Sequence, residues 1–125
     1  MKKKILIVED NDDTAEMIPL LLSSFQCVSV PSRDEALELI KSGLAPACVL
    51  MDYMMPGMTL AEFLREVEPF KLRILVMTGH DDSAAIAQLY GICGAMQKPI
   101  SPDLIVKVVE NIVGEAYKSD ATKNF

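Results

Sequence analysis

The stretch "ACVLMDYMMPG", residues 47–57, places a single carboxylate, that of Asp52, within an apolar run. Residues 47–51 are typical of a strand that is buried on both faces of a sheet. Burying an unpaired charge costs free energy, so a protein normally shifts the pKa of such a group or gives it a partner. The sequence therefore predicts that other polar groups meet Asp52 where this strand ends.

Short apolar runs alternate with helical patterns along the chain. Strands are predicted at Lys4–Val8, 27–30, 47–51, 73–77 and Gly94–Gln97, and helices at 11–25, 32–43, 60–67, 82–91 and 101–114. The second helix is well delimited, because Ser32 and Glu35 form a capping pattern and Gly43 follows the last turn. Five strand–helix units predict an α/β fold, with a parallel sheet covered by helices on both faces.

The first and last predicted helices carry further signals. Asp13 and Glu16 have the spacing of a capping box, and Pro19 predicts either a bend or a helix that effectively begins later. In the last helix, Ser101 is the expected cap and Pro102 takes the first helical position. Its predicted apolar stripe consists of Leu104, Ile105, Val108, Val109, Ile112 and Val113. The pattern then fades, which predicts one domain over residues 1–114 and a polar tail or linker, frayed at its end, over 115–125.

Composition excludes several classes of protein. The chain has 125 residues, the size of one domain, and no apolar stretch approaches the roughly 20 residues of a membrane span. The N-terminal apolar run is too short for a signal peptide, so a cytoplasmic protein with no membrane partner is expected. The net charge of −6 argues against direct nucleic-acid binding. Cys27, Cys48 and Cys93 lack metal-site spacing and are expected to be small buried residues.

Polar residues follow the predicted strands at the edge where sites form in parallel sheets. They are Glu9 and Asp10, Asp52, Thr78 and Gly79, and Lys98 and Pro99. Three clustered carboxylates repel one another unless a cation is present, and hard oxygen ligands suit Mg²⁺. A lysine and a hydroxyl suit a phosphoryl oxygen, and a carboxylate can be the nucleophile that forms an aspartyl phosphate. Asp52 is the natural candidate for that nucleophile.

The segments "ILIVEDN", "VLMDYMMPGM", "ILVMTG" and "QKPI" resemble the receiver domain of two-component response regulators, and the resemblance spans residues 3–113. It implies the flavodoxin-like strand order 2-1-3-4-5 and Asp52 as phosphoacceptor. It also implies that Mg²⁺ is bound by Glu9, Asp10, Asp52 and the backbone carbonyl of Met54. Thr78 would be the switch hydroxyl and Lys98 would pair with the phosphoryl group. Pro99 would follow a cis peptide, and Gly79 would leave room for the phosphodonor.

The resemblance also implies partners. The phosphoryl group would come from a phosphohistidine of a sensor histidine kinase or a histidine phosphotransfer protein. Signalling would reach a downstream output domain or target protein, and two copies could pair through the face made by the fourth helix, fifth strand and fifth helix. Such a domain assists its own phosphorylation and slow autodephosphorylation without being an enzyme in the usual sense.

Some positions depart from the family pattern. Ala95 stands where an aromatic switch residue is usual, and residues 58–60 replace a Met-Asp-Gly sequence. A degenerate receiver that acts only as a phosphorylation-independent interaction module is therefore an alternative. A phosphatase of the haloacid-dehalogenase type is disfavoured, because Met54 occupies the place of its second aspartate. His80 is expected to be a solvated loop residue or to tune the phosphoryl lifetime. Methionines 54, 55, 58, 77 and 96 are expected to fill the core and pack loops.

Overall fold

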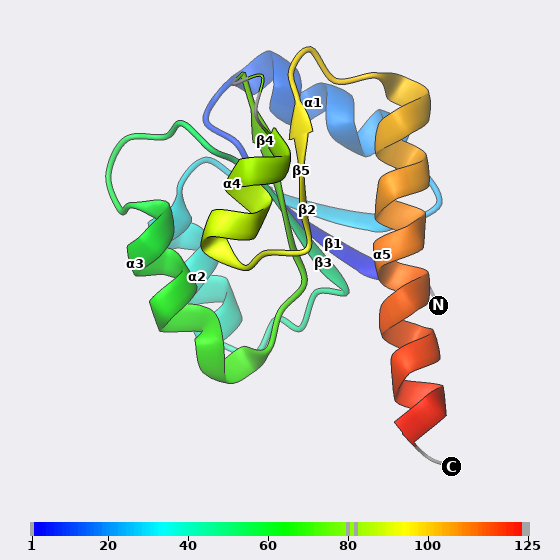
Figure 1. The fold of residues 1–125 in the computed structure, drawn as a ribbon. Coiled ribbons are helices and arrows are strands. Elements are labelled where there is room, and N and C mark those ends of the chain that lie inside the picture. The colour runs from blue at the N-terminus through cyan, green and yellow to red at the C-terminus, as the bar shows by residue number, and fades with distance from the viewer. Residues whose placement is uncertain (1, 80, 82, 124–125) are drawn as a thin grey trace.

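A five-stranded parallel sheet forms the centre of the molecule (Figure 1). The computed structural model describes the backbone of residues 2–79, 81 and 83–123, and side chains as far as residue 114. The strands are β1 (Lys4–Val8), β2 (Gln26–Val30), β3 (Cys48–Asp52), β4 (Ile74–Thr78) and β5 (Gly94–Gln97). Their order is β2-β1-β3-β4-β5 and every pair is parallel, which confirms the predicted fold class and strand order.

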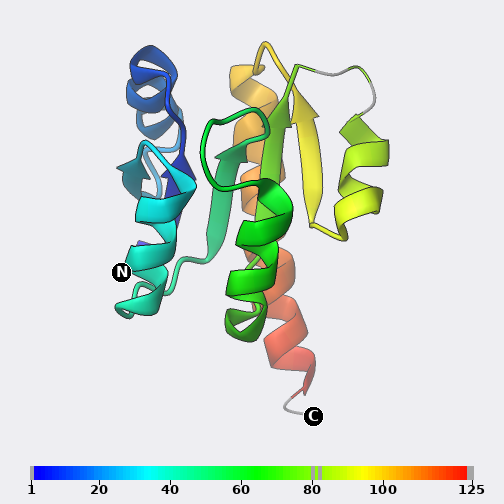
Figure 2. The same ribbon diagram turned by 90° about the vertical axis from the view of Figure 1, so that its left-hand side faces the viewer.

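Helices cover both faces of this sheet (Figures 1 and 2). They are α1 (Asp12–Leu21), α2 (Arg33–Lys41), α3 (Leu60–Val67), the 3₁₀ turn η1 (Glu68–Phe70), α4 (Ser83–Tyr90) and α5 (Pro102–Lys123). Helices α1 and α5 lie on one face, and α2, α3 and α4 on the other. Among the described residues, no helix is long and apolar enough to cross a membrane.

The core is split by the sheet into two apolar layers because side chains alternate along each strand. On β1, Ile5 and Ile7 pack in the layer with α1 and α5, whereas Leu6 and Val8 pack in the layer with α2 and α3. Strands β3 and β4 are buried along their whole length. Both extend one residue beyond the prediction, so Asp52 and Thr78 are the last residues of their strands.

Helix α1 differs from the prediction at both ends. Asn11, not Asp13, caps it, and the Asn11 side chain accepts a hydrogen bond from the Thr14 amide at 3.0 Å. The helix begins at Asp12, so the expectation of a later start is wrong. Pro19 lies inside the last turn, and the helix ends at Leu21 rather than continuing to residue 25. Proline has no amide hydrogen to donate, so the carbonyl four residues earlier, that of Ala15, receives no helical hydrogen bond from residue 19.

Helix α5 is longer than predicted and buries less of its stripe. Its backbone is helical to Lys123, beyond the predicted helix end at residue 114, and the division into a domain over residues 1–114 and a tail or linker over 115–125 stays a prediction. Loss of an apolar stripe does not stop a helix whose hydrogen bonds are local. Ile105, Val109 and Ile112 are buried as expected, but Leu104 is 50% exposed. The predicted cap holds, with the Ser101 hydroxyl 3.4 Å from the Leu104 amide.

The sulfur-containing residues divide between core and surface. The three cysteines are free thiols; Cys48 is buried, but Cys93 is exposed, so its predicted burial is wrong. Met77 and Met96 fill the core as predicted. Met55 and Met58 pack at the edge of the layer under α2 and α3. Met54 is 67% exposed, against the expectation of packing.

Candidate functional site

Three acidic residues meet at the carboxyl ends of β1 and β3. Glu9 follows β1 and its amide donates to the Val30 carbonyl at 3.1 Å, which holds it against β2. Glu9, Asp10 and Asp52 each offer an oxygen, and these oxygens all lie within 4.8 Å of one another. Glu9 and Asp52 are buried and Asp10 is exposed. The structure therefore brings the predicted trio together and leaves one side of it open to solvent.

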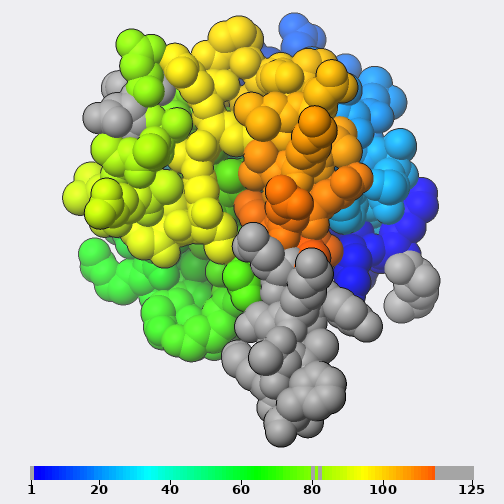
Figure 3. Space-filling model, turned by 45° about the vertical axis from the view of Figure 1, so that its right-hand side comes forward, coloured from blue at the N-terminus to red at the C-terminus, as the bar shows by residue number. Residues whose placement is uncertain are grey.

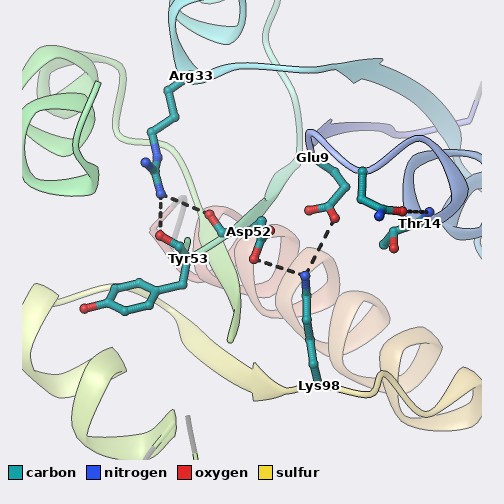
Figure 4. A network of polar contacts seen from close by, with 7 residues as sticks. Glu9, Thr14, Arg33, Asp52, Tyr53 and Lys98 are labelled. Carbon is teal, nitrogen blue, oxygen red and sulfur yellow. Dashed lines mark hydrogen bonds and ion pairs between the residues drawn. The ribbon is translucent and has the colours of Figure 1, made fainter. Parts of the chain in front are cut away.

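Lys98 joins this cluster from the end of β5 (Figure 4). Its Nζ lies 3.1 Å from Asp52 Oδ1 and 3.6 Å from Glu9 Oε1. The Lys98 amide donates to the Thr78 carbonyl at 2.6 Å, so the backbone carrying Lys98 continues the pairing of β5 with β4. The Lys98–Pro99 peptide is cis, as the resemblance implied. The negative charge of Asp52 is thus compensated by the Lys98 ammonium, which lies at ion-pair distance.

Thr78 ends β4 beside Gln97 in the sheet and is fully buried. The Gln97 side-chain amide donates to Asp81 at 2.7 Å, which ties the end of β5 to the loop after β4. A Cβ added to Gly79 would have no atom within 4 Å among the described residues other than its chain neighbours, so these residues leave the space beside Gly79 open. His80 lies outside the described residues.

Burial and neighbouring charge shift the ionisation of Glu9. Its pKa rises to about 7, first because burial disfavours the carboxylate and then because of the Asp52 charge, while Lys98 acts in the opposite direction. Both Glu9 carboxylate oxygens are buried without a hydrogen-bond partner among the described residues. Buried oxygens of this kind need a cation or a proton. The all-oxygen donor set of the trio fits a hard divalent cation such as Mg²⁺.

Arg33 is a member of this site that sequence reasoning missed. It is the first residue of α2, yet only 2% of it is exposed. Its Nη2 donates to the carbonyls of Asp52 at 3.0 Å and Tyr53 at 2.9 Å. A cation in the first turn of a helix opposes the helix dipole, and this was the available signal that the side chain is used elsewhere.

The buried polar residues of the described chain gather at this edge of the sheet. They are Glu9, Arg33, Asp52 and Thr78. Buried polar and charged groups cost stability, and their concentration at one place is typical of a functional site. Met54, the predicted carbonyl ligand, belongs to the loop that leaves β3 here, and its role stays a prediction.

Comparisons with known proteins agree with this arrangement. The sequence model of the response regulator receiver domain matches residues 5–110. The probable transcriptional regulatory protein NarL of Mycobacterium tuberculosis is 33% identical over 116 residues, which cover 86% of this chain and 53% of NarL. The transcriptional regulatory protein FixJ of Bradyrhizobium diazoefficiens is 29% identical over 123 residues, 92% of this chain and 58% of FixJ. The chain thus spans about half the length of these curated relatives.

Solved structures have the same fold. A putative response regulator from Chloroflexus aurantiacus superposes with a TM-score of 0.81 at 31% identity, covering 91% of this chain and 99% of that one. A response regulator receiver domain from Clostridium thermocellum gives a TM-score of 0.81 at 22% identity, covering 92% and 97%. With the match over residues 5–110 and the acids and lysine at the strand ends, this chain belongs to the receiver domains of two-component response regulators.

Proposed function

We propose that this receiver is switched by phosphorylation of Asp52. One observation above all supports the proposal: the Asp52 carboxylate is 3.1 Å from the Lys98 ammonium and shares a 4.8 Å cluster with Glu9 and Asp10. A purely structural aspartate would gain nothing from two further acids beside it, because like charges repel. The degenerate receiver is less well supported, since all five predicted polar residues are present and gathered at the strand ends.

In the proposed transfer, an Asp52 carboxylate oxygen attacks the phosphorus of a phosphohistidine. An oxygen–phosphorus bond forms, the phosphorus–nitrogen bond breaks, and its electron pair leaves with the imidazole. Lys98 is close enough to bind an oxygen of the incoming group, and Thr78 ends the neighbouring strand with a hydroxyl that can donate to another. Glu9, Asp10, Asp52 and the Met54 carbonyl would hold Mg²⁺, which when bound offsets the negative charge at this site.

The same proposal covers reversal of the switch. Water attacks the acyl phosphate and releases inorganic phosphate, which regenerates the Asp52 carboxylate. Slow autodephosphorylation of this kind needs no added general base, and it leaves the domain a phosphoacceptor rather than an enzyme in the usual sense.

The partners and location belong to the proposal as well. The phosphodonor is a sensor histidine kinase or a histidine phosphotransfer protein in the cytoplasm. The curated relatives are named as transcriptional regulatory proteins, and the matched residues cover only 53% and 58% of their length, which supports a downstream output domain or target protein. The β5 edge of the sheet, flanked by α4 and α5, forms one side of the molecule (Figure 3). Leu89 on α4 and Leu104 on α5 are exposed, which supports that side as a place where two copies pair.

Phosphorylation can be tested with a small acyl phosphate and Mg²⁺. Intact-mass spectrometry should detect one added phosphoryl group on the wild-type protein and none on Asp52→Asn. Asp103→Asn, the same change at an exposed carboxylate of α5, is the control and should remain phosphorylated. An Asp52→Asn protein that still gains the group would exclude Asp52 as the acceptor, and a wild-type protein that gains none would favour the degenerate receiver.

A further inference from the structure

Arg33 is a buried cation whose environment is unusual. Its acceptors among the described residues are three carbonyl oxygens and a thioether sulfur rather than a carboxylate. Nε lies 3.3 Å from the sulfur of Met51, and Nη1 donates to the Met58 carbonyl at 2.9 Å. Burying a guanidinium is costly, and here burial lowers the pKa of Arg33 while the Asp52 charge acts the other way. A side chain held at this cost needs a specific explanation.

Its carbonyl partners lie at the two ends of one loop, residues 53–59, which connects β3 to α3. Asp52 is the last residue of β3, Tyr53 is the first residue of this loop, and Met58 is near its end. One planar guanidinium therefore spans the loop from inside, with Nη1 at one end and Nη2 at the other. Met54, the expected carbonyl ligand, lies between these two fixed points and is itself 67% exposed.

The start of α2 packs against the same loop through a second residue. Gly57 has a φ of +87°, and a Cβ placed on it would lie 3.6 Å from the Asp34 carboxylate. The loop thus follows a path that favours glycine at one position and is fixed by Arg33 on either side of it. The contacts that hold this loop are thus made by the protein's own residues.

Figure 4 shows that Arg33 and Lys98 contact Asp52 from two different elements. Arg33 reaches the backbone oxygens of Asp52 and Tyr53 from α2, while Lys98 reaches the Asp52 carboxylate from β5. We propose that Arg33 is a positioning residue: its guanidinium fixes the backbone of residues 52–58 so that the Met54 carbonyl and the Asp52 side chain are held ready for Mg²⁺. This inference rests on the proposed function, since it concerns the cation of that same site.

Groups that orient metal ligands typically change metal affinity by about 10–100-fold when they are removed. Arg33→Lys keeps the positive charge but cannot donate to both ends of the loop, because an ammonium lacks the planar fork of a guanidinium. The expected result is an affinity for Mg²⁺ alone that falls by about tenfold or more. It can be measured by the intrinsic fluorescence of the tyrosines, which the chain offers without tryptophan.

Two further measurements separate positioning from simple destabilisation. In metal-free protein, amide exchange at residues 53–58 should quicken in Arg33→Lys. In phosphorylation by an acyl phosphate, the Mg²⁺ concentration for half the maximal rate should rise by the same factor as the dissociation constant, while the rate at saturating Mg²⁺ stays close to wild type.

Two variants serve as controls. Arg65→Lys makes the same change at an exposed position of α3 and should bind Mg²⁺ as the wild type does. Ile40→Val lowers stability from a fully buried position at the other end of α2 and should also leave Mg²⁺ affinity unchanged.

The outcomes distinguish this inference from the proposed function. Wild-type Mg²⁺ affinity and loop exchange in Arg33→Lys would overturn it, as would an equal loss of affinity in Ile40→Val. If the wild-type protein takes up no phosphoryl group but Arg33→Lys still weakens Mg²⁺ binding, the positioning role stands and the proposed phosphorylation fails.

Discussion

Two cations approach Asp52, from two regions of the molecule that lie far apart in the sequence. Lys98, after β5, contacts the Asp52 carboxylate at 3.1 Å, and its side chain is 31% exposed. Arg33, at the start of α2, contacts the Asp52 carbonyl at 3.0 Å and is 2% exposed. The same residue is therefore held through its side chain by one region and through its backbone by the other.

The difference separates charge from geometry. Lys98 is a partly hydrated point charge, so its contribution is electrostatic and it can follow an oxygen that moves. Arg33 is a rigid donor buried among carbonyls, so its contribution is to fix a path of the chain. If this division is correct, removing the two cations should damage the protein in different ways.

The largest expected effect is that of Lys98→Met on phosphoryl transfer. Losing a cation directed at the transferring group should lower the rate by about 10²–10³-fold. Amide exchange at residues 53–58 should not change, because Arg33 still holds that loop. Intact-mass spectrometry of samples quenched at successive times after addition of an acyl phosphate measures the rate. Faster amide exchange at residues 53–58 in Lys98→Met would show that the two cations are not independent.

Arg33→Met should lower the free energy of unfolding more than Lys98→Met does. The carbonyls of Asp52, Tyr53 and Met58 would lose a donor at one buried and two partly buried contacts, which we expect to lower the free energy of unfolding by about 2–4 kcal/mol. Urea unfolding measures this. Arg65→Met, at an exposed site, should change it by less than about 0.5 kcal/mol. Similar values for the two variants would contradict the buried role of Arg33.

The pH dependence of stability tests the environment of Glu9, which lies beside Lys98. Its pKa is about 7 in the folded protein and 4.5 ordinarily, so between these values the folded state holds a proton that the unfolded chain has released. The stability of metal-free protein should therefore fall as pH rises through this window, by at most about 3 kcal/mol from this group.

The control for Glu9 is Glu9→Gln, which should remove this part of the pH dependence in urea unfolding. Mg²⁺ should remove much of it too, because the cation binds the deprotonated carboxylate, and its affinity should increase with pH. The raised pKa of Glu9 would be contradicted if the metal-free wild-type protein gained stability over this pH range and the Glu9→Gln variant showed the same pH dependence.

The smallest expected effect is a redistribution of the response along β5 and α4. Ala95 is half-buried and has no ring to rotate, whereas Tyr90, at the end of α4, has its hydroxyl 3.4 Å from that of Tyr53. With beryllofluoride as phosphoryl mimic, amide protection should change mainly in residues 78–90 and less around Ala95. A response centred on Gly94–Gln97, with residues 79–83 silent, would show that another side chain does the work of the missing ring.

Most of the candidate site could be predicted because it follows from local pattern. Alternating apolar runs and helical segments specify a parallel sheet, and a parallel sheet brings the carboxyl ends of its strands to one edge. Glu9, Asp10, Asp52, Thr78 and Lys98 were recognisable on that basis. The structure brings the three acids and Lys98 together and ends the neighbouring strand at Thr78, while the roles of these residues stay predictions. The local capping pattern at Ser32 was predicted correctly for the same reason, since its hydrogen bond to Glu35 spans three residues.

The errors arose where neighbours in space decide the outcome. Leu104 belongs to an apolar stripe but is half-exposed, and Cys93 is apolar in character but lies on the surface, because the packing of one helix or strand end against another sets burial. Asn11 rather than Asp13 caps α1 because the chain leaves β1 on a path that places its side chain over the Thr14 amide.

The sequence by itself determined the layered fold and the acids, hydroxyl and lysine at the strand ends, because strand direction and apolar period are properties of short segments. Only the tertiary structure decided that Arg33 belongs to the site. Its acceptors lie 18 to 25 residues further along the chain, and they come within reach only after α2 has packed beside the loop that leaves β3. A long side chain can go to solvent or to the interior, and that choice depends on which acceptors the folded chain brings within its reach.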